Sequence, residues 1–209
     1  MSASALPAPP RVFASFVPHR GEGSVRAPAG RRVTRYVVDR VNPLRGSALE
    51  GVVPRAGLIR IESEERPAAP DAPLTGVTTH LVYTSAAARR ELTVSPAPES
   101  GPTAVLIPIT KSPAWWALAQ DERQAHFERR AGHLAVGMPY TDRIFRRLYH
   151  ARHLPGSTWD FLTYFEFPRD RTEEFETLLA ALRDPQKNPE WTFVERETEV
   201  WMTKVAPAA

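Results

Sequence analysis

The order of apolar segments after residue 102 constrains the fold more than any other feature of this chain. The stretch AVLIPIT (104–110) predicts a short strand, and Pro113 opens a helical stretch that we expect to reach about Tyr140. Two segments rich in aromatic and β-branched residues, 144–152 and 159–167, surround the turn-forming HLPGST and predict a hairpin. A strand, a helix and a hairpin therefore follow one another.

A second helix follows this hairpin. Asp170 and Glu173 form a capping-box pattern ahead of FETLLAAL, which predicts a helix start. The apolar side of this helix is expected to consist of Phe175, Leu178, Leu179 and Leu182. The earlier helical stretch is expected to break near Gly132 and Pro139. Its apolar face is expected to consist of Phe127, Ala131, Leu134 and Met138.

The final strand is expected over 191–204, which completes the strand–helix–strand–strand–helix–strand order of a ferredoxin-like unit. The first half looks like a reduced copy, with AAARREL as its helical piece. Its strand candidates are VFASFVP, RYVVDRV, LIRIES and GVTTHLVYT. We therefore expect an α+β protein with a reduced ferredoxin-like half at 31–102 and a second half at 103–209. The Pro- and Arg-rich residues 1–30 are expected to be a poorly ordered tail.

Composition excludes several classes of site and partner. The chain has no cysteine, which excludes disulfides, thiolate catalysis, iron–sulfur clusters and thiolate-held zinc or heme. Its 27 Lys and Arg residues are scattered among 24 Asp and Glu residues, which disfavours nucleic-acid binding. No apolar run is long enough for a membrane helix, and MSASALPAPPRVFASFVPHR lacks the pattern of a secretory signal. We expect a cytoplasmic protein with no nucleic-acid or membrane partner.

The histidines are the remaining candidates for holding a cofactor. They are His19, His80, His126, His133, His150 and His153. No HExxH or HxH motif joins them, which disfavours a metal site built from several histidines. A cofactor that needs one axial imidazole, such as heme, fits better. From pattern alone, a lone His on a partly apolar helix is more often a core residue, paired Trp residues are more often core, and adjacent arginines usually form a solvated edge.

Five motifs occur in a fixed order in the second half. They are LIPITKSPAWWALAQDER, GHLAVGMPY, RRLYHARHLPG, DFLTYFEF and VERETEVWM. Together they resemble the chlorite dismutase family of heme proteins, over about residues 76–204. The resemblance implies a dimeric α+β barrel built from two ferredoxin-like halves, in agreement with the pattern above. The length and the compact first half resemble the short branch of the family, which implies a homodimer.

The resemblance also implies a heme b site. The Gly-His histidine, His133, is implied as the proximal ligand of the iron, and Arg146 as the catalytic residue over the open face. Glu190 is the best match for the carboxylate that accepts a hydrogen bond from the proximal histidine. The residues implied near the heme edge and its propionates are Lys111, Trp115, Trp116 and Tyr83.

The activity implied by the resemblance is conversion of the small anion chlorite to chloride and dioxygen. Two other functions remain open at this point. A coproheme decarboxylase-like or peroxidase-like enzyme would use the same fold, with Tyr140 or Tyr149 as candidate for radical chemistry in the first case. A barrel that binds heme without catalysis, or binds no heme, would serve sensing, storage or interaction, because fold alone does not decide function.

Overall fold

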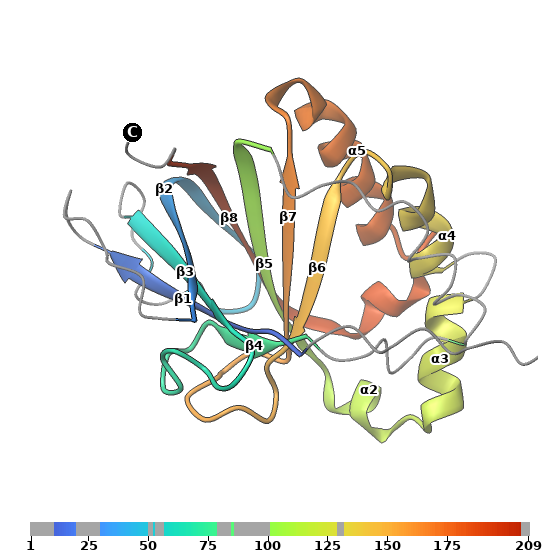
Figure 1. Ribbon diagram of the computed structural model, residues 1–209. Coiled ribbons are helices and arrows are strands. Elements are labelled where there is room, and N and C mark those ends of the chain that lie inside the picture. Colours follow the sequence, from blue (N-terminus) through green and yellow to red (C-terminus); the bar gives the residue numbers. More distant parts are fainter. Residues whose placement is uncertain are drawn as a thin grey trace, which may run out of the picture.

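Strands of both halves close into one antiparallel barrel (Figure 1). The computed structural model describes residues 11–19, 30–49, 52, 57–78, 85, 101–128 and 132–205. Within these residues the strand order around the barrel is β1-β3-β2-β8-β5-β7-β6-β4. The strands are β1 (Phe13–His19), β2 (Arg32–Arg45), β3 (Gly57–Ser63), β4 (Thr75–Val77), β5 (Thr103–Lys111), β6 (Phe145–His150), β7 (Phe161–Phe167) and β8 (Val194–Lys204).

The barrel divides into two halves with the same internal strand order. In the first half the neighbours are β4-β1-β3-β2, and in the second half they are β8-β5-β7-β6. Counted within each half, both follow the order fourth, first, third, second, which is that of a ferredoxin-like sheet. Pairing of β2 with β8 and of β4 with β6 joins the halves. The predicted α+β fold of two ferredoxin-like halves is therefore confirmed.

Barrel closure at β4 depends on a close approach of the backbone. β4 pairs with β6 through Val77 and His150. At Gly76, next to this pair, a Cβ atom would lie 2.6 Å from the Cβ of Tyr149. A side chain at this position would therefore push β4 away from β6, and only glycine allows the two strands to meet.

The helices gather on one side of the barrel, over the second half (Figure 1). They are α2 (Pro113–Ala117), α3 (Gln120–Glu128), α4 (His133–Gly137) and α5 (Thr172–Arg183), with 3-10 turns η1 (Met138–Tyr140), η2 (Arg169–Arg171) and η3 (Pro189–Phe193). No helix among the described residues is long and apolar enough to span a membrane.

The long helical stretch predicted up to Tyr140 is instead three short helices. Leu118 leaves helical geometry after α2, and Gly132 is extended before α4. The break expected near Gly132 is confirmed, but the single apolar face expected across it is wrong, because α3 ends at Glu128 and a new helix begins at His133. Ala131, which belonged to that face, lies outside the described residues.

The predicted helix after the hairpin is confirmed, but its predicted cap is wrong. Asp170 lies inside the 3-10 turn η2, and the helix begins one residue after Arg171. No side chain caps the first turn of α5. The buried face of α5 agrees with the sequence pattern and consists of Phe175, Leu178, Leu179 and Leu182.

Three boundaries differ from the sequence expectations. β1 lies within residues 1–30, so the segment expected to be a tail contributes a barrel strand. The last strand begins at Val194, because Pro189–Phe193 forms a 3-10 turn. The described part of the segment GVTTHLVYT contributes to β4, and its residues after Thr78, together with AAARREL, lie outside the described residues.

The barrel separates two apolar cores. Alternate side chains of a strand point to opposite faces, so one set fills the barrel and the other meets the helices. The inner core includes Phe16, Tyr36, Leu58, Leu106, Tyr149, Leu162, Tyr164 and Met202. The outer core, between the sheet and α5, includes Val105, Ile107, Phe165, Phe167, Phe175, Leu179, Trp191 and Trp201.

Phe175 is expected to anchor the outer core. Its ring is fully buried, with centroid distances of 4.5 Å to Phe167, 5.0 Å to Phe165 and 5.5 Å to Trp201. Phe175→Ala should lower the free energy of unfolding by about 3–5 kcal/mol, because it leaves a cavity under α5. Equilibrium urea unfolding measures this change. Glu176→Ala, on the exposed face of α5, is the control and should change it by less than about 1 kcal/mol; equal effects of both changes would contradict the anchoring role.

Candidate cofactor site

Three polar side chains meet between the outer face of the barrel and the short helices. Lys111 is the last residue of β5, His133 is the first residue of α4, and Glu190 lies in η3. The Nδ1 atom of His133 lies 3.1 Å from Oε2 of Glu190. The other carboxylate oxygen, Oε1, forms an ion pair with Nζ of Lys111. One buried carboxylate therefore contacts both an imidazole and an ammonium group.

The backbone around Glu190 explains why these groups meet. The amide of Ser112, next to Lys111, donates to the carbonyl of Phe193 at 2.8 Å and joins the end of β5 to η3. Asn188, which is fully buried, donates from Nδ2 to the carbonyl of Leu182 at 2.8 Å. These two contacts hold η3 between the end of α5 and the end of β5. Glu190 thereby faces the sheet edge where Lys111 ends.

The electrostatics of the cluster leave His133 neutral. Burial alone would raise the pKa of Glu190, but Lys111 and His133 outweigh it and hold that pKa below its usual value. For His133, burial lowers the pKa, and the nearby cations Arg146 and Lys111 lower it further against the opposing effect of Glu190. A neutral imidazole facing a carboxylate through Nδ1 keeps Nε2 as an acceptor or a metal ligand.

Arg146 approaches His133 from the sheet. It lies on β6, its side chain is exposed, and its Nη2 atom lies 3.4 Å from Nε2 of His133. The next residue, Arg147, points to the inside of the barrel, where its Nη1 lies 2.8 Å from Oε1 of Glu62. Strand alternation therefore assigns the two consecutive arginines to opposite faces of the sheet. Of the two arginines, Arg146 lies on the outer face of the sheet, beside the imidazole of His133.

The two tryptophans expected near the cofactor occupy different environments. Trp115 is fully buried, and its ring centroid lies 4.9 Å from Nζ of Lys111. Its indole therefore packs against Lys111 of the buried Lys111–Glu190 pair. The carboxylate that Lys111 meets is that of Glu190, whereas the sequence suggested a cofactor carboxylate. The ring of Phe127 joins Trp115 to His133, with centroid distances of 5.8 Å and 5.5 Å.

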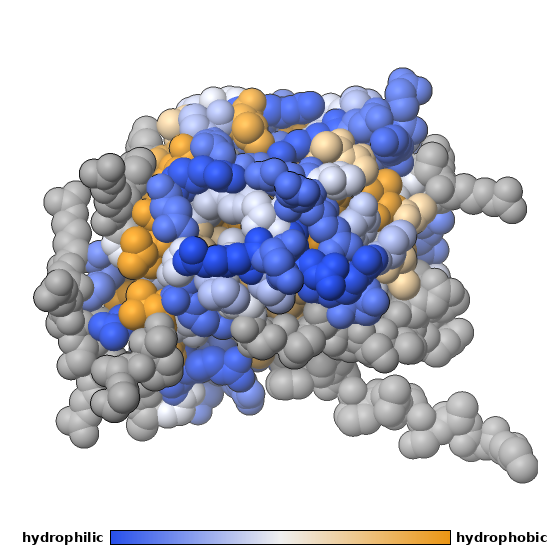
Figure 2. All heavy atoms as spheres, turned by 90° about the horizontal axis from the view of Figure 1, so that it is seen from above, coloured by the Kyte–Doolittle hydropathy of each residue, from blue (hydrophilic) through white to orange (hydrophobic). Residues whose placement is uncertain are grey.

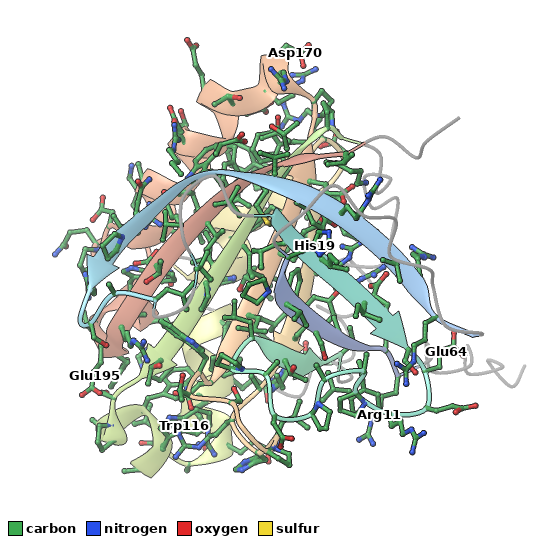
Figure 3. All side chains as sticks on the ribbon, turned by 90° about the vertical axis from the view of Figure 1, so that its left-hand side faces the viewer. Arg11, His19, Glu64, Trp116, Asp170 and Glu195 are labelled. Atoms are coloured by element: carbon green, nitrogen blue, oxygen red, sulfur yellow. The ribbon has the colours of Figure 1, made fainter. Side chains whose placement is uncertain are left out.

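Trp116 is half-buried near the lower end of the molecule in the view of Figure 3. Its Nε1 donates to Oδ2 of Asp160 at 3.3 Å, and its ring stacks on Phe161 at 5.9 Å. The guanidinium of Arg152 lies 3.9 Å above the same ring and donates to Oδ1 of Asp160 at 2.8 Å. The backbone amide of Lys111 also donates to Asp160, at 2.7 Å. Asp160 thus connects the Trp116 environment to the Lys111 end of β5.

The structure brings most of the predicted site residues into one region. His133, Glu190, Lys111 and Arg146 form a continuous series of contacts. Tyr83 lies outside the described residues. Sequence reasoning missed Asp160, although it quoted the segment DFLTYFEF that contains it. An Asp that directly precedes an aromatic-rich strand was the available signal, because a carboxylate there needs partners when it is buried.

The donor set suits a cofactor that brings most of its own ligands. No group of three or more His, Cys, Asp or Glu side chains within the described ranges is placed to hold a bare metal ion. The outer site instead offers one neutral imidazole, His133, backed by the carboxylate of Glu190. A single imidazole with such a carboxylate partner is the arrangement that suits an iron porphyrin.

Comparisons with known proteins indicate a family for this chain. A sequence model of the family described as chlorite dismutase matches residues 65–202. A curated chlorite dismutase from Ideonella dechloratans is 31% identical over 85 residues, which covers 41% of this chain and only 27% of that protein.

Solved structures extend the likeness to the whole barrel. A dimeric chlorite dismutase from Nitrobacter winogradskyi superposes with a TM-score of 0.71 at 31% identity, covering 91% of this chain and 99% of that chain. A chlorite dismutase from Candidatus Nitrospira defluvii, in complex with imidazole, has a TM-score of 0.62 at 23% identity, covering 94% and 90%. The second match supports the fold alone. On the family match and the first structure, this chain belongs to the chlorite dismutase family.

Proposed function

We propose that this protein binds heme b and converts chlorite to chloride and dioxygen. The observation that carries the proposal is the opposition of two groups on the outer face of the barrel. The imidazole of His133 presents Nε2 toward the guanidinium of Arg146, while its Nδ1 faces Glu190. One side of the site therefore offers a ligand for iron, and the other offers a fixed positive charge for an anion.

His133 would hold the iron from the helix side. Its lowered pKa keeps the imidazole neutral near pH 7, so Nε2 has a lone pair to give. Glu190 orients the ring through Nδ1 and increases its basicity as a ligand. Lys111 keeps Glu190 ionised, because its ammonium group is the largest of the influences that lower the pKa of this carboxyl. Lys111 thus acts on Glu190, and Glu190 acts on the imidazole whose Nε2 would bind the iron.

Arg146 would act from the sheet side. In the observed arrangement its guanidinium is too close to Nε2 for a porphyrin to lie between them. The side chain is exposed, so it has room to rotate away when a cofactor enters. A guanidinium keeps its charge at any working pH and carries several donors, which suits it to attract chlorite and retain a departing oxyanion.

The chemistry itself would come from the cofactor. Heme iron, when bound, supplies oxygen-atom transfer from an oxyanion. Arg146 would hold an anionic fragment of the substrate through its N–H donors and keep it from escaping to solvent. This positional and electrostatic role needs no proton from the guanidinium.

A coproheme decarboxylase-like function has less support from the same geometry. Tyr149 was one of two tyrosines open to radical chemistry, but it lies fully buried inside the barrel. Its hydroxyl donates to Oε1 of Glu62 at 3.1 Å, on the face of β6 opposite to Arg146. Tyr140 is half-buried beside the outer core, where Arg143 lies 5.8 Å from its ring. Tyr149 therefore faces away from the proposed heme side.

We also propose that the protein acts as a homodimer. The support is the structural relative from Nitrobacter winogradskyi, whose structure is described as dimeric. The placement of Trp116 and Tyr83 near the heme edge stays a prediction from the family resemblance.

Replacement of the proposed iron ligand should abolish tight heme binding. For His133→Ala we expect hemin affinity to fall by more than about 100-fold, beyond the loss usual for a residue that only orients a ligand. Titration of the purified chain with hemin, followed by the Soret band, measures the affinity. The control is His153→Ala, at an exposed turn position, which should bind hemin normally. An unaltered Soret spectrum in His133→Ala would exclude His133 as the ligand.

Replacement of Arg146 should separate heme binding from turnover. Arg146→Ala should keep its Soret band but lose about 100- to 1,000-fold in kcat with chlorite, the size of effect expected for one group that stabilises a developing anion. It should also release more hypochlorite, because the guanidinium no longer retains the fragment. An oxygen electrode measures turnover, and a chlorination trap measures hypochlorite. Arg169→Ala, at an exposed position in η2, is the matched control; equal kinetics in both variants would contradict the assigned role.

Removal of Lys111 should make heme binding sensitive to mild acid. Lys111 lowers the pKa of both Glu190 and His133, so without it the pair takes up a proton at higher pH. Since a protonated imidazole cannot bind iron, hemin affinity should be lost at a higher pH in Lys111→Met than in the parent chain as the solution is acidified. Hemin titrations over a series of pH values test this. Lys187→Met, which removes an exposed ammonium group, should behave like the parent.

A further inference from the structure

A second candidate binding site lies at the mouth of the barrel. A cavity of about 670 Å³ lies there between the end of β3, the residues that precede β1 and β2, and Arg147 of β6. This volume is within the range of small-molecule sites, about 300–1,000 Å³. Figure 3 shows Glu64, which lines the cavity, on the same side of the barrel as Arg11, next to the lining residue Val12. The proposed heme site lies on the other face of β6.

The floor of the cavity is a carboxylate whose charge is already balanced. Glu62 is 5% exposed, and its Oε1 accepts from Nη1 of Arg147 at 2.8 Å and from the hydroxyl of Tyr149 at 3.1 Å. Its Oε2 lies 3.6 Å from Nη2 of Arg60 and 3.7 Å from Nη1 of Arg32. Three guanidinium groups therefore surround one carboxylate.

The wall next to this floor adds a further cation and a hydroxyl. Arg31 is half-buried, lines the cavity and makes no ion pair with the residues that the structure describes. Ser63 is 8% exposed, and its Oγ accepts from the amide of Glu65 at 3.4 Å, which leaves its hydroxyl hydrogen to donate. Arg31 and Ser63 thus offer donors that no anion among the described residues occupies.

The acidic lining residues lie at the rim. Glu64 and Glu65 are exposed, as is the neighbouring Arg66. Water and salt screen exposed charges much more than the half-buried charges of the deeper wall. The rim therefore carries one net negative charge that solvent screens, and the deeper guanidinium groups of Arg31 and Arg147 have the larger effect on which sign of ligand charge the cavity favours.

We propose that this cavity binds a small anion bearing carboxylate or phosphate groups, with Arg31 and Arg147 as its charged partners and Ser63 as a hydroxyl donor. Guanidinium groups bind such oxyanions through paired N–H donors. The site is separate from the one proposed for heme, because Arg147 and Arg146 point to opposite faces of β6. Binding here should leave the contact of Arg146 with His133 unchanged.

Calorimetric titration of the full-length, heme-free chain tests the proposal. The probes are succinate and inorganic phosphate, each in a buffer of low ionic strength. At least one of them should give saturable binding. Arg31→Gln should weaken that binding by about tenfold or more, the loss expected for a charge-assisted hydrogen bond. Arg169→Gln, which removes the same charge from an exposed position in η2, should change it by less than about twofold.

Several outcomes would overturn the proposal. Absence of saturable heat with both anions would do so, as would equal weakening by Arg31→Gln and Arg169→Gln, which indicates a general charge effect. Binding of the dication putrescine in place of either anion, lost in Glu64→Gln, would assign the cavity to cations. An unchanged thermal midpoint in Arg31→Gln shows that the variant is folded. Because no heme is present, these results do not depend on whether the chain turns over chlorite.

Discussion

Closure of the strands into a barrel is the constraint on which the other features depend. A closed antiparallel sheet has an inside and an outside, and alternate residues of each strand are divided between them. On β6 this alternation sends Arg146 to the helix-covered face and Arg147 to the interior. The space-filling view in Figure 2 shows a largely hydrophilic face, as expected where strand ends and loops cover the apolar interior. One strand thus contributes to two sites with different chemistry.

The buried carboxylate of Glu190 illustrates how the outer site is stabilised. A carboxylate that is 3% exposed is costly unless charged or hydrogen-bonding partners surround it. Here Lys111 and His133 supply those partners from two other elements. The arrangement also determines the protonation of the imidazole, because burial and the surrounding cations together lower the pKa of His133. The contacts of Glu190 with Lys111 and His133 thus stabilise the buried carboxylate and also orient the imidazole proposed to bind the cofactor.

The interior of the barrel follows the same principle with different residues. Glu62 is compensated by guanidinium groups from β2, β3 and β6 and by the hydroxyl of Tyr149. Deeper inside, the hydroxyls of Tyr36 and Tyr164 lie 2.9 Å apart, and Arg60 lies 4.4 Å above the ring of Tyr164. Burial raises the pKa of Tyr36 to about 12, so this hydroxyl stays protonated. The interior is therefore a polar network set within an apolar core, and Arg147 extends this network to the cavity mouth.

Local pattern in the sequence was sufficient for much of the second half and for the family. Apolar periodicity determined the buried face of α5, aromatic and β-branched runs indicated β6 and β7, and the ordered motifs indicated the family. Tertiary structure alone decided which charged groups meet. Lys111 and Glu190 are 79 residues apart in the chain, and Glu62 and Arg147 are 85 apart, so no local rule could pair them. The break between α2 and α3 is likewise tertiary, because short helices gain most of their stability from packing. The break before α4 was indicated in the sequence by Gly132.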